Sequence, residues 1–291
     1  MKLPAFTYHR PDSLQEALAV LAEHEEAKVV AGGQSLLPMM ALRLARPEHL
    51  VDISRLPELS SIRECDGGIA IGAAVTHATA ERSPLVTTGS PMLAAALPLI
   101  GHQAIRNRGT VCGSLAHADA AAELPAVALA LDATLVATSP RGERTLTPAD
   151  FFEGYLSTAL EPDELLTEVR LPAWPASATT AVHELSRRHG DFALVGIAAM
   201  VTTAEDGTVA SAALSFFGAA SVPCRVAEAE ASLVGRQPDE ETIAEAAAIV
   251  SARLAPPDDI HASRAYRQHA AGVLTRRALA EATTNGKMAA A

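Results

Sequence analysis

Two glycine-rich stretches carry the residues whose types and spacing best suit ligand binding. The first is Ala31-Gly32-Gly33-Gln34-Ser35-Leu36, which follows a short β-branched run. Adjacent glycines let the backbone turn with positive φ and approach another group without an intervening Cβ. Successive N–H groups in such a turn form a concave anion site, to which Ser35 adds a hydroxyl donor. The stretch matches neither G-x-G-x-x-G nor the P-loop pattern, so an anion site and an ordinary tight turn both remain open.

The second stretch runs from Gly101 to Asp119 and again places hydroxyls beside glycines, as Gly109-Thr110 and Gly113-Ser114. A helix is expected over residues 120–131, with Asp119 and Glu123 four apart on one face. Free N–H groups and the dipole at a helix N-terminus favour an anion. The alternative to an anion site is that these glycines are present only because the backbone is tightly packed there.

A third candidate is the loop Ser186-Arg187-Arg188-His189-Gly190-Asp191-Phe192. For its charged residues, a salt-bridged surface turn is the simplest interpretation. Aromatic residues make up only 3% of the chain. An aromatic side chain beside a charged glycine loop therefore makes Phe192 a candidate for covering a planar ligand.

Several function classes fit the sequence poorly. The formal net charge of −11 and the lack of a dense basic run argue against nucleic-acid binding. The ten histidines are scattered without H-E-x-x-H, so no metal site is expected. Leu36 and Leu37 follow Ser35, so the G-x-S-x-G pattern of a serine hydrolase is not met. Three distant cysteines make neither a disulfide framework nor a C-x-x-C cluster and favour a reducing, cytoplasmic compartment.

The elements that position these stretches follow from hydrophobic spacing. Residues 6–35 predict strand, helix, strand, which places the first glycine turn at the carboxyl end of a strand, a common ligand position in α/β folds. Pro172-Ala173-Trp174-Pro175 is interpreted as a linker. Beyond it we expect three antiparallel strands, then helices over 227–233, 240–254 and 263–282, then a frayed tail. Neither a signal peptide nor a transmembrane segment is expected.

Taken together, the motifs resemble the flavoprotein (medium) subunit of the molybdenum hydroxylases, the family of carbon monoxide dehydrogenase and the xanthine-type dehydrogenases. The resemblance rests on residues 31–36, on residues 105–119 and on Gly190-Asp191-Phe192-Ala193, and it spans nearly the whole chain. It implies an α+β fold: two FAD-binding subdomains of the p-cresol methylhydroxylase type, at 1–57 and 58–174, then a small C-terminal α/β domain at 175–285, with a tail at 286–291.

The resemblance also implies roles for individual residues. It places residues 31–36 around the FAD diphosphate together with Thr110, Gly113 and Ser114, and Glu123 on the ribityl or ribose hydroxyls. Phe192 matches a position that contacts the isoalloxazine ring, and Arg106 or Arg108 is expected near the phosphates. The FAD is expected to be non-covalent, with no catalytic or metal-binding residue on this chain. The predicted cofactor-binding residues are Ala31, Gly32, Gly33, Gln34, Ser35, Leu36, Gly101, Thr110, Gly113, Ser114, Glu123 and Phe192.

In such a family the chain is an electron relay in a three-part complex. A large subunit would hold the molybdenum cofactor and a small subunit two [2Fe–2S] clusters, in a dimer of heterotrimers. FAD on this chain would pass electrons to NAD, a quinone or oxygen, between which the sequence does not choose. A stand-alone flavin oxidoreductase of the same fold is the leading alternative, and a non-enzymatic FAD scaffold the third. Many relatives carry Lys just before the third motif, where this chain has His183-Glu184.

Overall fold

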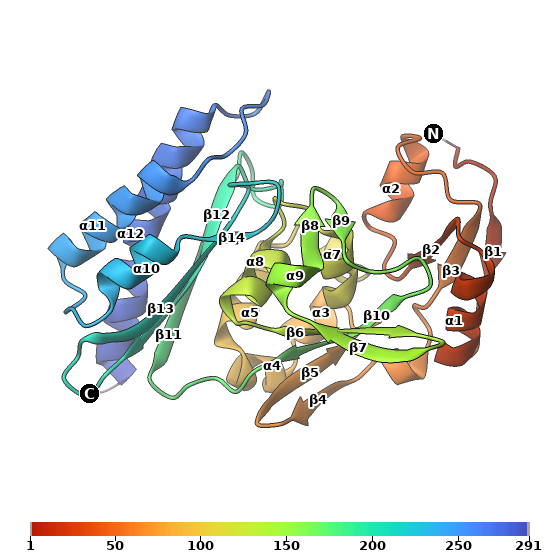
Figure 1. Cartoon of the computed structure of the whole chain (residues 1–291), viewed down its shortest axis with the longest axis horizontal. Coiled ribbons are helices and arrows are strands. Elements are labelled where there is room, and N and C mark those ends of the chain that lie inside the picture. The colour runs from red at the N-terminus through yellow and green to blue at the C-terminus, as the bar shows by residue number, and fades with distance from the viewer. Residues whose placement is uncertain (1, 290–291) are drawn as a thin grey trace.

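The N-terminal part is a small parallel sheet in the order β1-β3-β2 (Figure 1), in a computed structural model that describes residues 2–289. The Ser13 side chain accepts a hydrogen bond from the Glu16 N–H and so starts the first helix, which buries Ala17, Leu18 and Leu21. The elements are β1 (Thr7–His9), α1 (Leu14–Glu23), β2 (Ala27–Val30), α2 (Leu36–Ala41) and β3 (His49–Asp52).

The middle of the chain forms an antiparallel sheet in the order β4-β5-β10-β6-β7. Its strands are β4 (Ile62–Cys65), β5 (Gly68–Gly72), β6 (Thr134–Ser139), β7 (Gly142–Leu146) and β10 (Leu165–Leu171). The chain between β5 and β6 forms the helices α3 (His77–Glu81), α4 (Pro84–Gly89), α5 (Pro91–Ala96), α6 (Gln103–Arg106), α7 (Val111–His117) and α8 (Glu123–Ala130). The middle part also contains two short 3₁₀ turns, at Pro57–Leu59 and Leu97–Leu99, and the single helical turn α9 (Pro148–Phe151). The strands β8 (Phe152–Gly154) and β9 (Ser157–Thr158) form a small hairpin.

The C-terminal part is a four-stranded antiparallel sheet between two helix layers. The helices α10 and α12 pack on one face and α11 packs against both of them, while α5 and α8 of the middle part contact the other face (Figure 1). Its elements are β11 (Ala178–Leu185), β12 (Val195–Thr203), β13 (Val209–Phe217), β14 (Cys224–Arg225), α10 (Ala227–Leu233), α11 (Glu240–Arg253) and α12 (Arg264–Ala289).

The mixed helix-and-sheet architecture and the C-terminal antiparallel sheet confirm the predicted fold class. Two helix predictions were wrong at their ends. The helix expected from residue 120 begins at Glu123, because the Asp119 carboxylate accepts a hydrogen bond from the Ala121 N–H and holds a turn there. The last helix continues through Ala289, so residues 283–289 are helical where a frayed tail was expected. Residues 290 and 291 of that tail lie outside the described residues, and the domain boundaries at 57 and 174 stay predictions.

Between residues 2 and 289, none of the helices combines the length and the apolar character that crossing a bilayer requires.

Candidate cofactor site

A single cavity of about 550 Å³ lies where the three predicted loops meet. Its walls include the glycine turn after β2, the segment from Gly101 to α8, and the loop between β11 and β12. All twelve residues predicted to bind the cofactor line it: Ala31, Gly32, Gly33, Gln34, Ser35, Leu36, Gly101, Thr110, Gly113, Ser114, Glu123 and Phe192. The fold thus brings together residues that lie up to 161 positions apart, from 31 to 192.

The first glycine turn leaves β2 with its polar groups partly free. Gly33 adopts a φ of +70°, which a residue without Cβ tolerates. The Gln34 side-chain amide donates to the Gly32 carbonyl and closes the turn. Ser35 precedes α2, yet its side chain makes no capping hydrogen bond, so the hydroxyl is available to a ligand.

Of the two adjacent glycines, Gly32 makes the tighter contact with the rest of the protein. A Cβ on Gly33 would meet only the flexible Leu37 side chain, at 2.9 Å. A Cβ on Gly32 would lie 2.0 Å from the Arg108 carbonyl oxygen. Gly32 is therefore required for contact with the second glycine stretch.

The second stretch is pinned by backbone hydrogen bonds to the start of α3. The His77 N–H donates to the Gly109 carbonyl at 2.8 Å, and the Val111 N–H donates to the Val75 carbonyl at 3.1 Å. The Thr110 hydroxyl accepts from the Gly113 N–H and caps α7. Gly113 and Ser114 consequently lie inside a helix, an element that was not expected before residue 120.

The third loop packs against the beginning of the second stretch. Gly190 has a φ of +84°, and a Cβ there would come within 2.6 Å of the His102 ring. Gly101 is likewise left-handed, with a φ of +48°. Phe192 lines the cavity and remains 68% exposed, as a side chain at the rim would be.

Three buried or half-buried ionisable groups in or beside the cavity have strongly shifted pKa values. Burial raises the pKa of Glu123 to about 7, with smaller contributions from the nearby charges of Glu184 and Asp119. Burial also raises the pKa of Glu184 to about 7. His77, which lines the cavity, is only 4% exposed, and burial lowers its pKa to about 4.

Several buried polar atoms at the site have no hydrogen-bond partner within the described protein. These are both ring nitrogens of His77 and one carboxylate oxygen of Glu184. Leaving such groups unpaired costs about 1–3 kcal/mol each, so a polar ligand that reaches them is favoured. Hydroxyl groups, which both donate and accept, suit this set of unpaired atoms.

Arg106 or Arg108 was expected near the phosphates, and neither contributes to the cavity wall. The Arg106 guanidinium is buried and donates to the Glu81 carboxylate and to the carbonyls of Pro98, Ile100 and Gly101. Arg106 therefore holds the turn at Gly101 in place without lining the cavity. Within residues 2–289, the only Lys or Arg in the cavity wall is Lys28, on β2.

Sequence reasoning missed His77 and Lys28 as wall residues. Neither lies in a glycine motif. His77 enters the wall because the backbone pairing of α3 with Gly109 carries it there. Local sequence patterns do not reveal such long-range backbone pairing. For Lys28 there was a weak signal, because it is a basic residue two positions before the end of a predicted strand that leads into the glycine turn.

Comparison with known protein families gives two matches that together span most of the chain. Residues 4–174 match the FAD binding domain in molybdopterin dehydrogenase, and residues 180–282 match the CO dehydrogenase flavoprotein C-terminal domain.

Two relatives of similar length illustrate the likeness. The 6-hydroxypseudooxynicotine dehydrogenase complex subunit alpha of Paenarthrobacter nicotinovorans is 42% identical over 283 residues, covering 97% of this chain and 96% of the relative. The carbon monoxide dehydrogenase medium chain of Hydrogenophaga pseudoflava is 38% identical, covering 95% and 96%.

Solved structures share the whole fold. Carbon monoxide dehydrogenase from Hydrogenophaga pseudoflava superposes with a TM-score of 0.94 at 39% identity, over 98% of this chain and 99% of that chain. Quinoline 2-oxidoreductase from Pseudomonas putida 86 gives a TM-score of 0.94 at 40% identity, with the same coverage.

Proposed function

Because the chain belongs to the FAD-binding medium subunits of the molybdenum hydroxylases, a family of oxidoreductases, we propose that it relays electrons within a three-subunit complex. In this proposal electrons arrive from [2Fe–2S] clusters on a small partner subunit. They leave through FAD on this chain to an external acceptor, while a large subunit carries the molybdenum cofactor. FAD supplies the redox chemistry, since its flavin ring accepts and releases electrons.

The observation that carries the proposal is the convergence of all three loops on one cavity with unpaired buried polar atoms. The glycine turn at residues 31–36 would hold the diphosphate through its backbone N–H groups and the free Ser35 hydroxyl. Ser114 would add a donor from α7, and Lys28 is the cation available to offset phosphate charge.

The sugar and ring portions of FAD would meet other parts of the wall. Glu123 is buried at the start of α8, and its carboxyl group would accept from ribityl or ribose hydroxyls. Phe192 would cover the flavin ring from the rim of the cavity. Cys112 lines the cavity, but it is 2% exposed and its thiol donates to the Ile71 carbonyl, which supports non-covalent binding.

The location of the iron–sulfur clusters on another chain follows from the cysteines. One cluster requires four thiolate ligands. This chain has three free cysteines, Cys65, Cys112 and Cys224, far apart in sequence. A cluster bound by this chain alone is therefore incompatible with its ligand supply.

The test is purification of the chain with the products of its neighbouring reading frames. We expect a complex of three different subunits whose flavin is released on denaturation and is reduced by substrate only when all subunits are present. A chain without releasable flavin contradicts the cofactor assignment. A chain that holds flavin and oxidises substrate alone contradicts the relay and favours a stand-alone flavin oxidoreductase.

A matched pair of variants tests the site itself. Ser114→Ala should weaken FAD binding by about 1–2 kcal/mol, as expected for one lost hydrogen bond to a charged group. Ser232→Ala removes a hydroxyl that bonds only to the Ala229 carbonyl on α10, so it should leave FAD binding unchanged. Equal effects of the two substitutions would place the cofactor elsewhere.

A further inference from the structure

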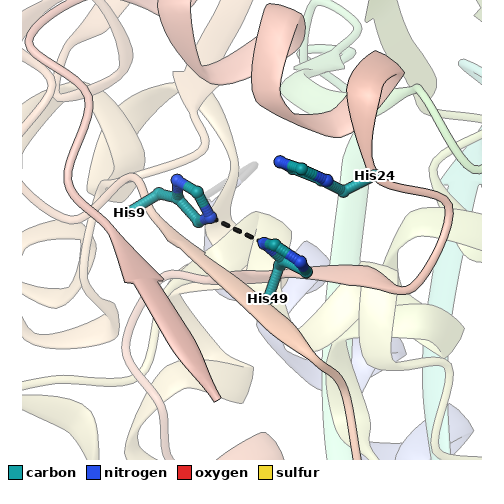
Figure 2. A group of neighbouring side chains, drawn as sticks. All are labelled: His9, His24 and His49. Carbon is teal, nitrogen blue, oxygen red and sulfur yellow. Dashed lines mark hydrogen bonds between the residues drawn. The ribbon is translucent and has the colours of Figure 1, made fainter.

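Three histidines that are distant in the sequence meet at one face of the N-terminal sheet (Figure 2). His9 ends β1, His24 follows α1, and His49 begins β3. In Figure 2 the His9 ring is hydrogen-bonded to the His49 ring and the His24 ring lies over the His49 ring, and all three side chains are half-buried. The sequence alone did not predict this cluster, because the three histidines are 15 and 25 positions apart in the chain.

The nitrogen atoms of the three rings lie within the range that one metal ion can span. One ligand nitrogen from each ring is within 4.8 Å of the others. His9 Nε2 and His49 Nδ1 are hydrogen-bonded at 2.8 Å, and the His24 ring stacks on the His49 ring with centroids 3.8 Å apart. A strand, a helix end and a second strand hold these positions, so the fold itself brings the three rings together.

All three side chains are imidazoles, a ligand type that suits divalent transition metals such as Zn²⁺, Cu²⁺ and Ni²⁺. A neutral imidazole offers a lone pair, whereas an imidazolium does not. Neutral histidines are also the main nitrogen ligands of zinc in proteins.

We propose that His9, His24 and His49 form a binding site for one divalent transition-metal ion, with Zn²⁺ as the reference ion. Three imidazole ligands leave the fourth tetrahedral position to a water molecule, which the half-buried surroundings admit. Nitrogen-rich sites of this kind also follow the Irving–Williams order, so Cu²⁺ and Ni²⁺ are expected to compete.

Metal binding requires small rearrangements that the structure defines. Tetrahedral ligands with bonds of about 2.0–2.1 Å have their nitrogens about 3.3 Å apart. The His9–His49 pair must therefore separate by about half an ångström from its 2.8 Å hydrogen bond. The proton shared in that bond moves to the other nitrogen of its own ring, and the His24 ring tilts out of its stack to aim its lone pair at the ion.

This site is separate from the cofactor cavity. None of the three histidines lines that cavity. The wall residue that follows His24 most closely in the chain is Lys28 on β2, so the two sites are neighbours that share no side chain. A metal at this position would link β1, β3 and the connection from α1 to β2, and would stabilise the fold because the unfolded chain cannot offer the three ligands together.

The experiment uses the full chain in its purified, flavin-loaded complex, stripped of metal by a chelator and dialysed against Zn²⁺. Bound zinc is measured by elemental analysis, and thermal unfolding by circular dichroism. We expect one zinc per chain that saturates and a raised midpoint of unfolding. His49→Ala and His9→Gln should each weaken zinc binding at least about tenfold, because even the loss of a residue that only hydrogen-bonds to a metal ligand has an effect of this size.

His261→Ala is the matched control, because His261 is exposed in the loop before α12 and lies outside the cluster. This variant should bind zinc as the parent chain does. His9→Gln retains a side chain of similar size, and unchanged flavin content verifies that the variant is folded. Zinc binding that survives in both cluster variants, or that is lost equally in His261→Ala, overturns the proposal.

Discussion

The backbone of Gly32 lies directly against the backbone of Arg108, so closely that a Cβ on Gly32 would come within 2.0 Å of the Arg108 carbonyl oxygen. The two glycine stretches are thus in contact before any ligand is considered. Backbone carbonyls do not yield as a flexible side chain does. This contact joins the N-terminal sheet to the helices of the middle part at the wall of the cavity.

Gly32→Ala should therefore damage both stability and flavin binding. Overpacking of this kind typically costs about 1–3 kcal/mol, and moving the two stretches apart would distort the cavity. The measurements are the midpoint of thermal unfolding and the flavin-to-protein ratio. Gly154→Ala is the control, since a Cβ there meets nothing closer than 3.9 Å. A Gly32→Ala variant with parental stability and full flavin would show that the stretches do not need this contact.

Arg106→Gln should destabilise the chain strongly. The Arg106 guanidinium is buried, and it pairs with Glu81 at 3.0 Å while donating to three carbonyl groups around Gly101. Removing one partner of a buried ion pair typically costs about 3–5 kcal/mol. The same substitution at Arg63, whose side chain is 49% exposed and pairs with Glu168, should cost about 0–1 kcal/mol. Chemical unfolding measures both, and equal costs would contradict the structural role of Arg106.

Glu123→Gln should change how the stability of the flavin-free chain depends on pH. The folded pKa of Glu123 is about 7, above the ordinary value of 4.5, so between these values the folded chain binds more protons than the unfolded chain. Stability from this group is present below about pH 4.5 and is lost as the pH rises toward 7. Gln does not titrate, so the advantage of the variant over the parent should grow over this range, by up to about 3 kcal/mol.

Urea unfolding at pH 5 and pH 8 measures this difference. The exposed carboxyl of Glu153, on β8, provides the control, and Glu153→Gln should show no such growth. A constant offset between Glu123→Gln and the parent at both pH values would mean that the carboxyl titrates normally in the folded chain.

Phe192→Ala should separate flavin contact from folding. The side chain is 68% exposed, so little burial is lost and the midpoint of unfolding of the flavin-free chain should hardly change. If the ring covers the flavin, its loss should alter the flavin absorption spectrum and the rate of flavin reduction in the complex. Tyr266→Ala, at a 48% exposed position on α12, should alter neither. An unchanged flavin spectrum in Phe192→Ala would remove Phe192 from the proposed ring contacts.

The sequence by itself determined the family, the mixed architecture and the order of the loops, because glycine turns, hydrophobic periods and ordered motifs are local in the chain. The family resemblance is confirmed by the two domain matches. Residues 31–36 follow a strand as expected, and the antiparallel C-terminal sheet follows from short turns between apolar runs. Helix ends were less certain, since one side-chain bond from Asp119 delays the start of α8.

Only the tertiary structure decided which side chains face the cavity and which support it. Arg106 and Lys28 are both cations near glycine motifs, yet Arg106 is turned into the protein by Glu81 and three carbonyls while Lys28 lines the cavity wall. His9, His24 and His49 give no pattern in the chain: the parallel pairing of β1 with β3 brings His9 near His49, and the end of α1 adds His24. Long-range backbone pairing sets such neighbours, and a single sequence does not encode them in its local spacing.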